Sequence, residues 1–293
     1  LDRILVEPLW PGSTTRLEDP FGYGRYALSV YDVASNRRIF FQGFDSLFAE
    51  YRTTGPALAG VKRVFCRPVR FPCPKDPVRL VVEQRDKENI LHPMFTQTID
   101  PADCHLITES PATGDWVFPV QQTGDPHEKV DVVFIAEGYT AADKDKFQAD
   151  AGRAAGWLFE VEPYKSARDR FNIRAIYRPS PESGMDEPRQ HVYRKTVLNA
   201  SFNAFDLDRY QLTEETRALH DMAAQVPYDA IIILVNSKRY GGGSIGGDYC
   251  ITTVDHARSS EVMVHELGHS FAGLADEYYQ AEVSYNDMYP PGV

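Results

Sequence analysis

The front part of the chain alternates short apolar runs with turn-forming residues. Residues 25–33 and 37–44 are rich in aromatic and β-branched side chains, and Ala34-Ser35-Asn36 between them supplies a turn, which predicts a β-hairpin. Residues 61–69 and 78–83 have the same character. Because Pro and Gly punctuate these runs and no helical periodicity of useful length interrupts them, residues 1 to about 112 predict a β-sandwich.

Beyond residue 129 the pattern changes to strands that alternate with helices. Residues 130–135 form a continuous apolar run, typical of a buried strand, and apolar side chains recur at helical spacing over 141–159. Further elements are expected as a strand at 171–177, a helix at 213–224, and strands at 229–236 and 248–254. The strand at 229–236 is the most strongly apolar, so we expect it in the centre of a sheet.

A segment with several prolines and glycines separates the two patterns. Residues 110–129 carry three prolines and two glycines, as expected of a linker that partly packs through Trp116 and Phe118. We therefore predict an α+β chain of two domains: a β-sandwich over 1–115, a linker over 116–129 and an α/β domain over 130–293.

Composition and charge narrow the classes of function. The chain has 293 residues, 43% hydrophobic and 25% charged, as in ordinary globular proteins. A formal net charge of −11 without a Lys/Arg cluster argues against a nucleic-acid partner, and the longest apolar run is too short for a membrane span. The cysteines lack CxxC spacing, so we expect free or partly paired thiols rather than a cysteine zinc site; they are Cys66, Cys73, Cys104 and Cys250.

The two ends of the chain suggest a longer precursor. The sequence starts at Leu1 without an initiator Met or an apolar signal segment, so we expect that a leader has been removed. Only residues 280–293 follow Tyr279, a short stretch for the wall of a substrate pocket, so the sequence leaves open whether the native chain continues past Val293.

A zinc-binding motif is the strongest chemical signal. In the run SSEVMVHELGHSFAGLADEYY at 259–279, His265, Glu266 and His269 form HExxH. On a helix, residues four apart lie one turn apart on the same face, so both imidazoles can bind one Zn²⁺ ion. Glu266 lies about 100° round the helix from His265, which suits a general base that takes a proton from water beside the ion.

The ends of this helix predict a third ligand. Ser259 or Ser260 can cap its start, and Gly273 can end it in a left-handed turn. Asp276 stands three residues beyond Gly273, which is the glycine-to-ligand spacing of the HExxHxxGxxH arrangement, so we predict Asp276 as the third zinc ligand.

The other acidic and tyrosine residues near this end are assigned different roles. Glu277 would point to the opposite side of an extended segment, which suits a salt bridge or support of the ligands. Glu282 and Asp287 would need a second helix that the sequence does not convincingly encode. Tyr278 or Tyr279 can help to stabilise the oxyanion formed during hydrolysis.

A glycine-rich run precedes the last predicted strand. Residues 241–247 lack the Lys-Ser/Thr of a phosphate-binding loop, and a strand rather than a helix follows them, so a nucleotide site is rejected. We predict that 248–254 is an exposed sheet edge that binds substrate as an added β-strand, with the glycines leaving room for a peptide backbone. A plain flexible connection is the alternative reading of the glycines.

Several separated blocks resemble one family. VHELGHSFAGLADEYY, DVVFIAEGYT, RFNIRA, ESGMD and YDAIIILVNSKRYGGG are similar, in this order, to the IgA-peptidase family of zinc metallopeptidases, over residues of about 130 to 279. The β-rich front resembles the family's N-terminal domain. The resemblance implies a bacterial metallopeptidase that is secreted, periplasmic or on the cell surface. It also implies a zincin or metzincin-like catalytic domain with His265 and His269 as zinc ligands and Glu266 as the catalytic glutamate.

The leading hypothesis is therefore a zinc-dependent endopeptidase that acts on protein or peptide substrates. One rival is a catalytically weak or inactive zincin that serves as a surface module binding protein or glycan, and another is a zinc-stabilised structural protein. An open ligand position at the ion favours hydrolysis, whereas four protein ligands favour a structural site.

Overall fold

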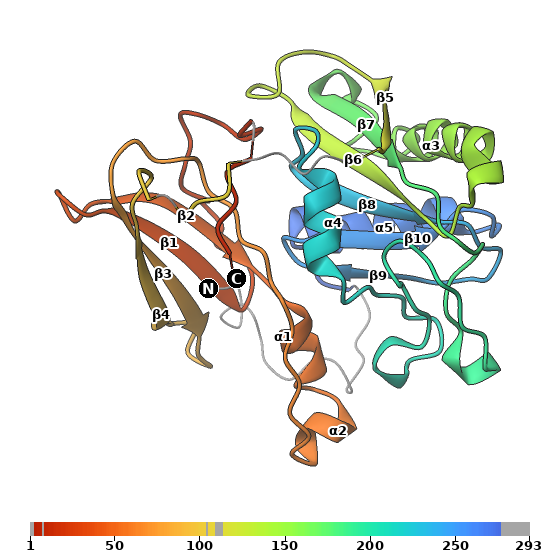
Figure 1. Ribbon diagram of the computed structural model, residues 1–293, viewed down its shortest axis with the longest axis horizontal. Helices are drawn as coiled ribbons and strands as arrows, with labels where there is room; N and C mark the ends of the chain where they lie inside the picture. Colours follow the sequence, from red (N-terminus) through yellow and green to blue (C-terminus); the bar gives the residue numbers. More distant parts are fainter. Residues whose placement is uncertain (1–2, 8, 104, 109–113, 277–293) are drawn as a thin grey trace.

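The computed structural model describes residues 3–7, 9–103, 105–108 and 114–276, and in them the chain forms one sheet of four strands and one of six (Figure 1). We call the residues before 109 the N-terminal region and residues 114–276 the C-terminal region. None of the described helices is both long and apolar enough to cross a bilayer.

The N-terminal region is built on an antiparallel sheet with the strand order β2-β1-β3-β4. Its strands are β1 (Tyr26–Asp32), β2 (Arg38–Phe44), β3 (Val78–Arg85) and β4 (Leu91–Ile99). β1 and β2 form the predicted hairpin. Side chains of one face make a small core: Tyr26, Leu28, Val30, Phe40, Phe44, Val78, Leu80 and Ile99.

The predicted β-sandwich is wrong for the described part of the N-terminal region, which contains one sheet rather than two. The expected strand at 61–69 has no regular secondary structure. Irregular segments supply the second layer, because partly buried side chains such as Trp10, Leu17 and Phe71 pack against the sheet. Alternating apolar residues therefore predicted a covered face correctly but could not tell whether a second sheet or irregular chain covers it.

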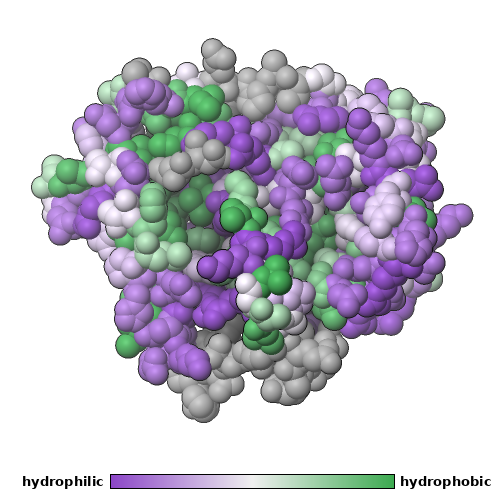
Figure 2. All heavy atoms as spheres, turned by 60° about the horizontal axis from the view of Figure 1, so that its bottom comes forward, coloured by the Kyte–Doolittle hydropathy of each residue, from purple (hydrophilic) through white to green (hydrophobic). Residues whose placement is uncertain are grey.

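Two short helices follow β2 and lie between the two sheets in Figure 1: α1 (Leu47–Tyr51) and α2 (Gly55–Leu58). Leu47 is buried in a core cluster of the C-terminal region rather than in that of its own sheet. On the face that carries α2, apolar side chains are set among polar ones and form no single large patch (Figure 2). The helices thus connect the two regions through a specific buried contact.

The C-terminal region is a mixed sheet with the order β5-β7-β6-β8-β10-β9. Its strands are β5 (Trp116–Gln121), β6 (Val130–Glu137), β7 (Phe171–Tyr177), β8 (Ala230–Val235), β9 (Gly242–Ile245) and β10 (Tyr249–Thr253). The four interior strands are parallel, whereas β5 and β9 run antiparallel at the two edges. β8 lies inside the sheet as predicted, and β5 occupies the start of the segment expected to be a linker.

Helices cover both faces of this sheet. α3 (Lys144–Leu158) and α5 (Ser259–Ala272) bury their apolar residues in one core cluster, and α4 (Thr216–Ala223) buries its own in the other. Side chains of β6 alternate accordingly, with Phe134 in the first cluster and Ile135 in the second. Short 3-10 turns complete the region at Ala141–Asp143, Arg168–Arg170, Pro188–Gln190 and Ala204–Asp206.

Candidate active site

The HExxH segment forms helix α5, with its apolar face on the sheet. Met263 and Leu267 are buried in the core, which turns His265 and His269 toward the open side. The two Nε2 atoms lie 3.0 Å apart. Ser259 begins the helix, and Arg258 rather than a serine is its N-cap residue.

Gly273 ends the helix as expected and returns the chain toward the histidines. Its φ of +64° lies in the left-handed region that favours glycine, and the Leu274 amide donates to the Gly268 carbonyl at 3.1 Å. Asp276 follows, and its Oδ1 lies 3.2 Å from the Nε2 atoms of both His265 and His269. The predicted third residue is therefore beside the histidine pair.

The spacing of these three groups fits a zinc ion. Their ligand atoms form a triangle with sides of 3.0, 3.2 and 3.2 Å. Zinc with bonds of about 2.0 to 2.1 Å in a tetrahedron requires ligand atoms roughly 3.3 Å apart. Among the residues that the structure describes, His265, His269 and Asp276 are the group able to hold a metal.

The hydrogen bond of His269 favours the tautomer that a metal needs. Its Nδ1 lies 2.6 Å from the Leu274 carbonyl oxygen, which can only accept, so Nδ1 carries the proton. Nε2 is thereby left with a lone pair directed at the other two groups. The helix exit thus orients both Asp276 and the imidazole of His269.

Glu266 lies between the helix and strand β9. The hydroxyl of Ser244 donates to its Oε2 at 2.9 Å. A Cβ atom at Gly242 would lie 2.4 Å from Cγ1 of Val262 and 3.0 Å from Oε1 of Glu266, so only glycine permits this approach of strand and helix. Burial raises the pKa of Glu266, and the Ser244 hydroxyl and the two imidazoles lower it.

The sheet edge beside the site is β9, so the prediction that 248–254 forms the edge is wrong. β10 pairs with β8 on one side and with β9 on the other. The glycine-rich run carries no side-chain pattern typical of a strand, which is why its own pairing could not be recognised. The edge is partly covered, because Gly242 exchanges hydrogen bonds with Arg209 and Gln211.

Two residues near the site carried no sequence signal. Tyr210 donates its hydroxyl to the Ser244 carbonyl at 3.4 Å, and burial, Glu50 and Glu266 raise its pKa. Glu50 comes from α1 in the N-terminal region, and Asp45 just before that helix donates its amide to the Gly246 carbonyl at 2.8 Å. Both reach the site through the packing of distant segments. Glu277, Tyr278 and Tyr279 lie outside the described residues, as do Glu282 and Asp287.

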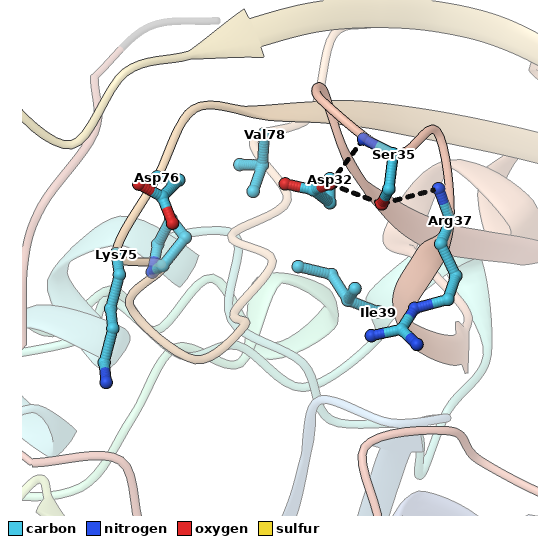
Figure 3. Close-up of a pocket in the computed structure, with 8 residues that line it drawn as sticks. Asp32, Ser35, Arg37, Ile39, Lys75, Asp76 and Val78 are labelled. Atoms are coloured by element: carbon cyan, nitrogen blue, oxygen red, sulfur yellow. Dashed lines mark hydrogen bonds between the residues drawn. The ribbon is translucent and has the colours of Figure 1, made fainter.

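A shallow depression on the N-terminal region is a weaker candidate. It lies beside the turn between β1 and β2, where Ser35 and Asp32 bond to one another (Figure 3). The opposite end of this hairpin, at Phe44, leads to α1 and the C-terminal region. The depression is therefore separated from α5 by the length of the hairpin.

Comparison with known proteins agrees with the geometry around α5. A model of the peptidase M64 N-terminus matches residues 1–96, and a model of IgA peptidase M64 matches residues 118–291. No curated protein matches the chain significantly. The chain therefore belongs to the IgA peptidase M64 family of metallopeptidases.

Proposed function

We propose that the protein is a zinc-dependent endopeptidase, with His265, His269 and Asp276 as ligands and Glu266 as general base. The observation that carries this proposal is the triangle of ligand atoms beside a buried glutamate. Zn²⁺ bound there would lower the pKa of water and polarise the scissile carbonyl. The intact set of ligands and base favours hydrolysis over a role restricted to binding.

Glu266 would move the protons. Burial raises the pKa of its carboxyl group, whereas the Ser244 hydroxyl and the two imidazoles lower it. It would take a proton from the attacking water and give it to the leaving amine. Ser244 would hold one carboxylate oxygen in a fixed direction while the other remains available.

β9 is the edge strand beside Glu266, and Ser244 is its partly exposed residue. Gly242 uses its outward amide and carbonyl with Arg209 and Gln211, and the Ser244 carbonyl accepts from Tyr210. Strand alternation directs the Ser244 amide to the same outward side, so a substrate backbone would pair with this amide, next to Glu266. Tyr210, kept protonated by its raised pKa, would donate to the developing oxyanion, as Tyr278 or Tyr279 would in our prediction from sequence.

Metal analysis combined with digestion tests this function. The purified protein should contain about one zinc per chain and cleave members of a peptide library, with cleavage lost in a chelator and restored by added zinc. Protein with zinc bound that leaves every peptide intact would contradict hydrolysis, and cleavage that persists after complete metal removal would contradict the role of zinc.

A further inference from the structure

Arg67 of the N-terminal region reaches the turn between β9 and β10. Its Nε donates to the Asp45 carbonyl at 2.8 Å, and its Nη2 donates to the Gly247 carbonyl at 2.8 Å. Nη1 donates to the Pro68 carbonyl at 2.8 Å and lies 3.0 Å from Oδ1 of Asp248. The planar fork of one guanidinium therefore ties the chain after β2 to a turn of the C-terminal region.

The charge of Arg67 has a buried partner in this turn. The side chain of Asp248 is 1% exposed and that of Arg67 is 14% exposed. Burial opposes the ionisation of Asp248, but Arg67 and His220, whose Nε2 lies 2.7 Å from the same Oδ1, together lower the pKa of Asp248 below its usual value. The guanidinium also lies 5.1 Å from the centre of the Phe44 ring. Because a buried carboxylate needs its cation, Arg67 is held in one position between the two regions.

The turn is also attached to α5. The Asp45 amide donates to the Gly246 carbonyl at 2.8 Å, and the Gly247 amide donates to the carbonyl of Ser270 at 2.9 Å. Ser270 lies on α5 and directly follows His269, one of the proposed zinc ligands. The turn is thus fixed between the chain after β2 on one side and the end of α5 on the other.

The position of this turn determines the position of Ser244. Ser244 lies on β9, two residues before Gly246, and its hydroxyl donates to Oε2 of Glu266 at 2.9 Å. β9 has a length of 4 residues, so a shift of the turn at its end is transmitted directly to Ser244. Loss of the Arg67 contacts would therefore change the direction in which the Ser244 hydroxyl points.

We propose that Arg67 is a positioning residue for hydrolysis: it fixes the turn between β9 and β10 and thereby keeps the Ser244 hydroxyl directed at Glu266. This inference rests on the proposed function, in which Glu266 is the general base. The zinc site would not depend on Arg67, because α5 is held on the sheet by its buried Met263 and Leu267. The N-terminal region would thus contribute to the rate of hydrolysis without contacting the substrate.

Arg67→Ala in the full chain tests this role. The kcat of the folded, zinc-loaded protein should fall by roughly 10- to 100-fold, because a misplacement of about 1 Å is enough for such a loss, while its zinc affinity stays close to that of the parent. Arg67→Lys keeps a charge near Asp248 but not the fork, so its kcat should be intermediate. Arg63→Ala is the matched control and should keep the kcat of the parent, because Arg63 joins the two regions elsewhere, through Glu214 at 2.6 Å.

A double-mutant cycle separates positioning from a general loss of stability. Ser244→Ala removes the hydroxyl through which Arg67 is proposed to act, so Arg67→Ala should lower kcat much less in this background than in the parent. If Arg67→Ala does not fold, Arg67→Lys takes its place in the cycle. An unchanged kcat in the folded Arg67 variant, or an equal loss in both backgrounds, would overturn the proposal.

Hydrogen exchange gives a readout that does not need catalysis. In the zinc-loaded Arg67 variant the amides of residues 242–248 should exchange roughly 10-fold faster than in the parent, whereas those of residues 263–267 should keep their rates. Unchanged exchange over 242–248 would overturn the role of Arg67. A parent protein that hydrolyses no peptide, combined with the expected change in exchange, would refute the peptidase function alone and confirm that Arg67 positions the turn.

Discussion

Two buried glutamates of the C-terminal region compare a structural carboxylate with the one that we propose as the general base. Glu137, at the end of β6, accepts hydrogen bonds from the Thr196 hydroxyl and from the amides of Leu198 and Ala200. Glu266, on α5, accepts one from Ser244 within the described residues. Burial raises the pKa of both. Burial alone therefore does not make a base, because the three donors around Glu137 leave its oxygens occupied.

Glu137 organises the loop that lies beside the active site. Its carboxylate holds residues 196–200. The next residue, Ser201, pairs with Leu212, and Tyr210 lies two residues before Leu212. The amide of Gly184 also donates to the carbonyl of Gly138, the residue after Glu137, at 3.0 Å. The blocks DVVFIAEGYT and ESGMD therefore meet in space and support the loop, although neither contains one of the three proposed ligands.

The largest effect is expected for Glu266→Gln. It removes the proposed base but none of the proposed ligands, so kcat/KM should fall by about 10²- to 10⁴-fold while zinc content and unfolding free energy stay close to those of the parent. Peptide hydrolysis, metal analysis and denaturant titration measure the three quantities. Glu261→Gln, an exposed position on the same helix, should retain activity. Equal turnover by parent and Glu266→Gln would remove the distinction between the two glutamates.

Asp276→Ala should weaken zinc binding by more than about 100-fold, because it removes one of the three proposed ligands, whose ligand atoms lie close together. Competition with a chromophoric chelator measures this affinity. Glu277→Ala and Glu282→Ala should have much smaller effects. If Glu277→Ala alone strips the metal, Asp276 is not the ligand.

Glu137→Gln should have the opposite profile to Glu266→Gln. The Gln side chain would place an NH2 group where a carboxylate oxygen of Glu137 now accepts hydrogen bonds. Two donors would then face one another, so the unfolding free energy should fall by about 2 to 4 kcal/mol. Urea titration measures the loss, with the exposed Glu128→Gln as control. The remaining folded protein should still bind zinc with the affinity of the parent. A Glu137→Gln protein that is as stable as the parent but binds zinc more weakly would show that the carboxylate of Glu137 contributes to zinc binding.

A third carboxylate, more open to solvent, should show the smallest effect. Burial raises the pKa of Asp229 to about 6, although its Oδ2 accepts the Asp131 amide at 2.8 Å. A raised pKa means that the folded state binds the proton more tightly, so this contribution to stability is present below pH of about 4 and is lost as pH rises through 6. Asp229→Asn should therefore gain on the order of 1 kcal/mol relative to the parent between pH 4 and 7, after allowance for solvent screening. A difference in unfolding free energy between Asp229→Asn and the parent that stays constant from pH 4 to 7 would contradict this prediction.

The parts that the sequence predicts well depend on local or continuous signals. β7 agrees with its prediction residue by residue, and β6 and β8 within two positions, because strands covered on both faces need unbroken apolar runs. Asp276 lies where its spacing from Gly273 puts it, because a left-handed turn restricts the path of the next few residues.

The parts that it does not predict depend on contacts between distant segments. Nothing around Asp45 or Tyr210 indicates that the segment before α1 and the loop before α4 meet at β9 and the turn after it, since these approaches arise from packing. β9 lacks a side-chain signal because glycines compose half of it. The β-sandwich failed since a pattern of apolar residues reports burial and not the identity of the covering layer.

The burial of Leu47 in the C-terminal core has a consequence for synthesis of the chain. The cluster that encloses it is completed by β8 and β10, which leave the ribosome long after α1. Domains usually begin to fold as they emerge, so the N-terminal sheet forms while Leu47 is still in contact with water. A nascent chain that stalls before β8 therefore exposes the apolar side chain of Leu47 to water, next to the acidic Glu50, until β8 and β10 complete the core that covers Leu47.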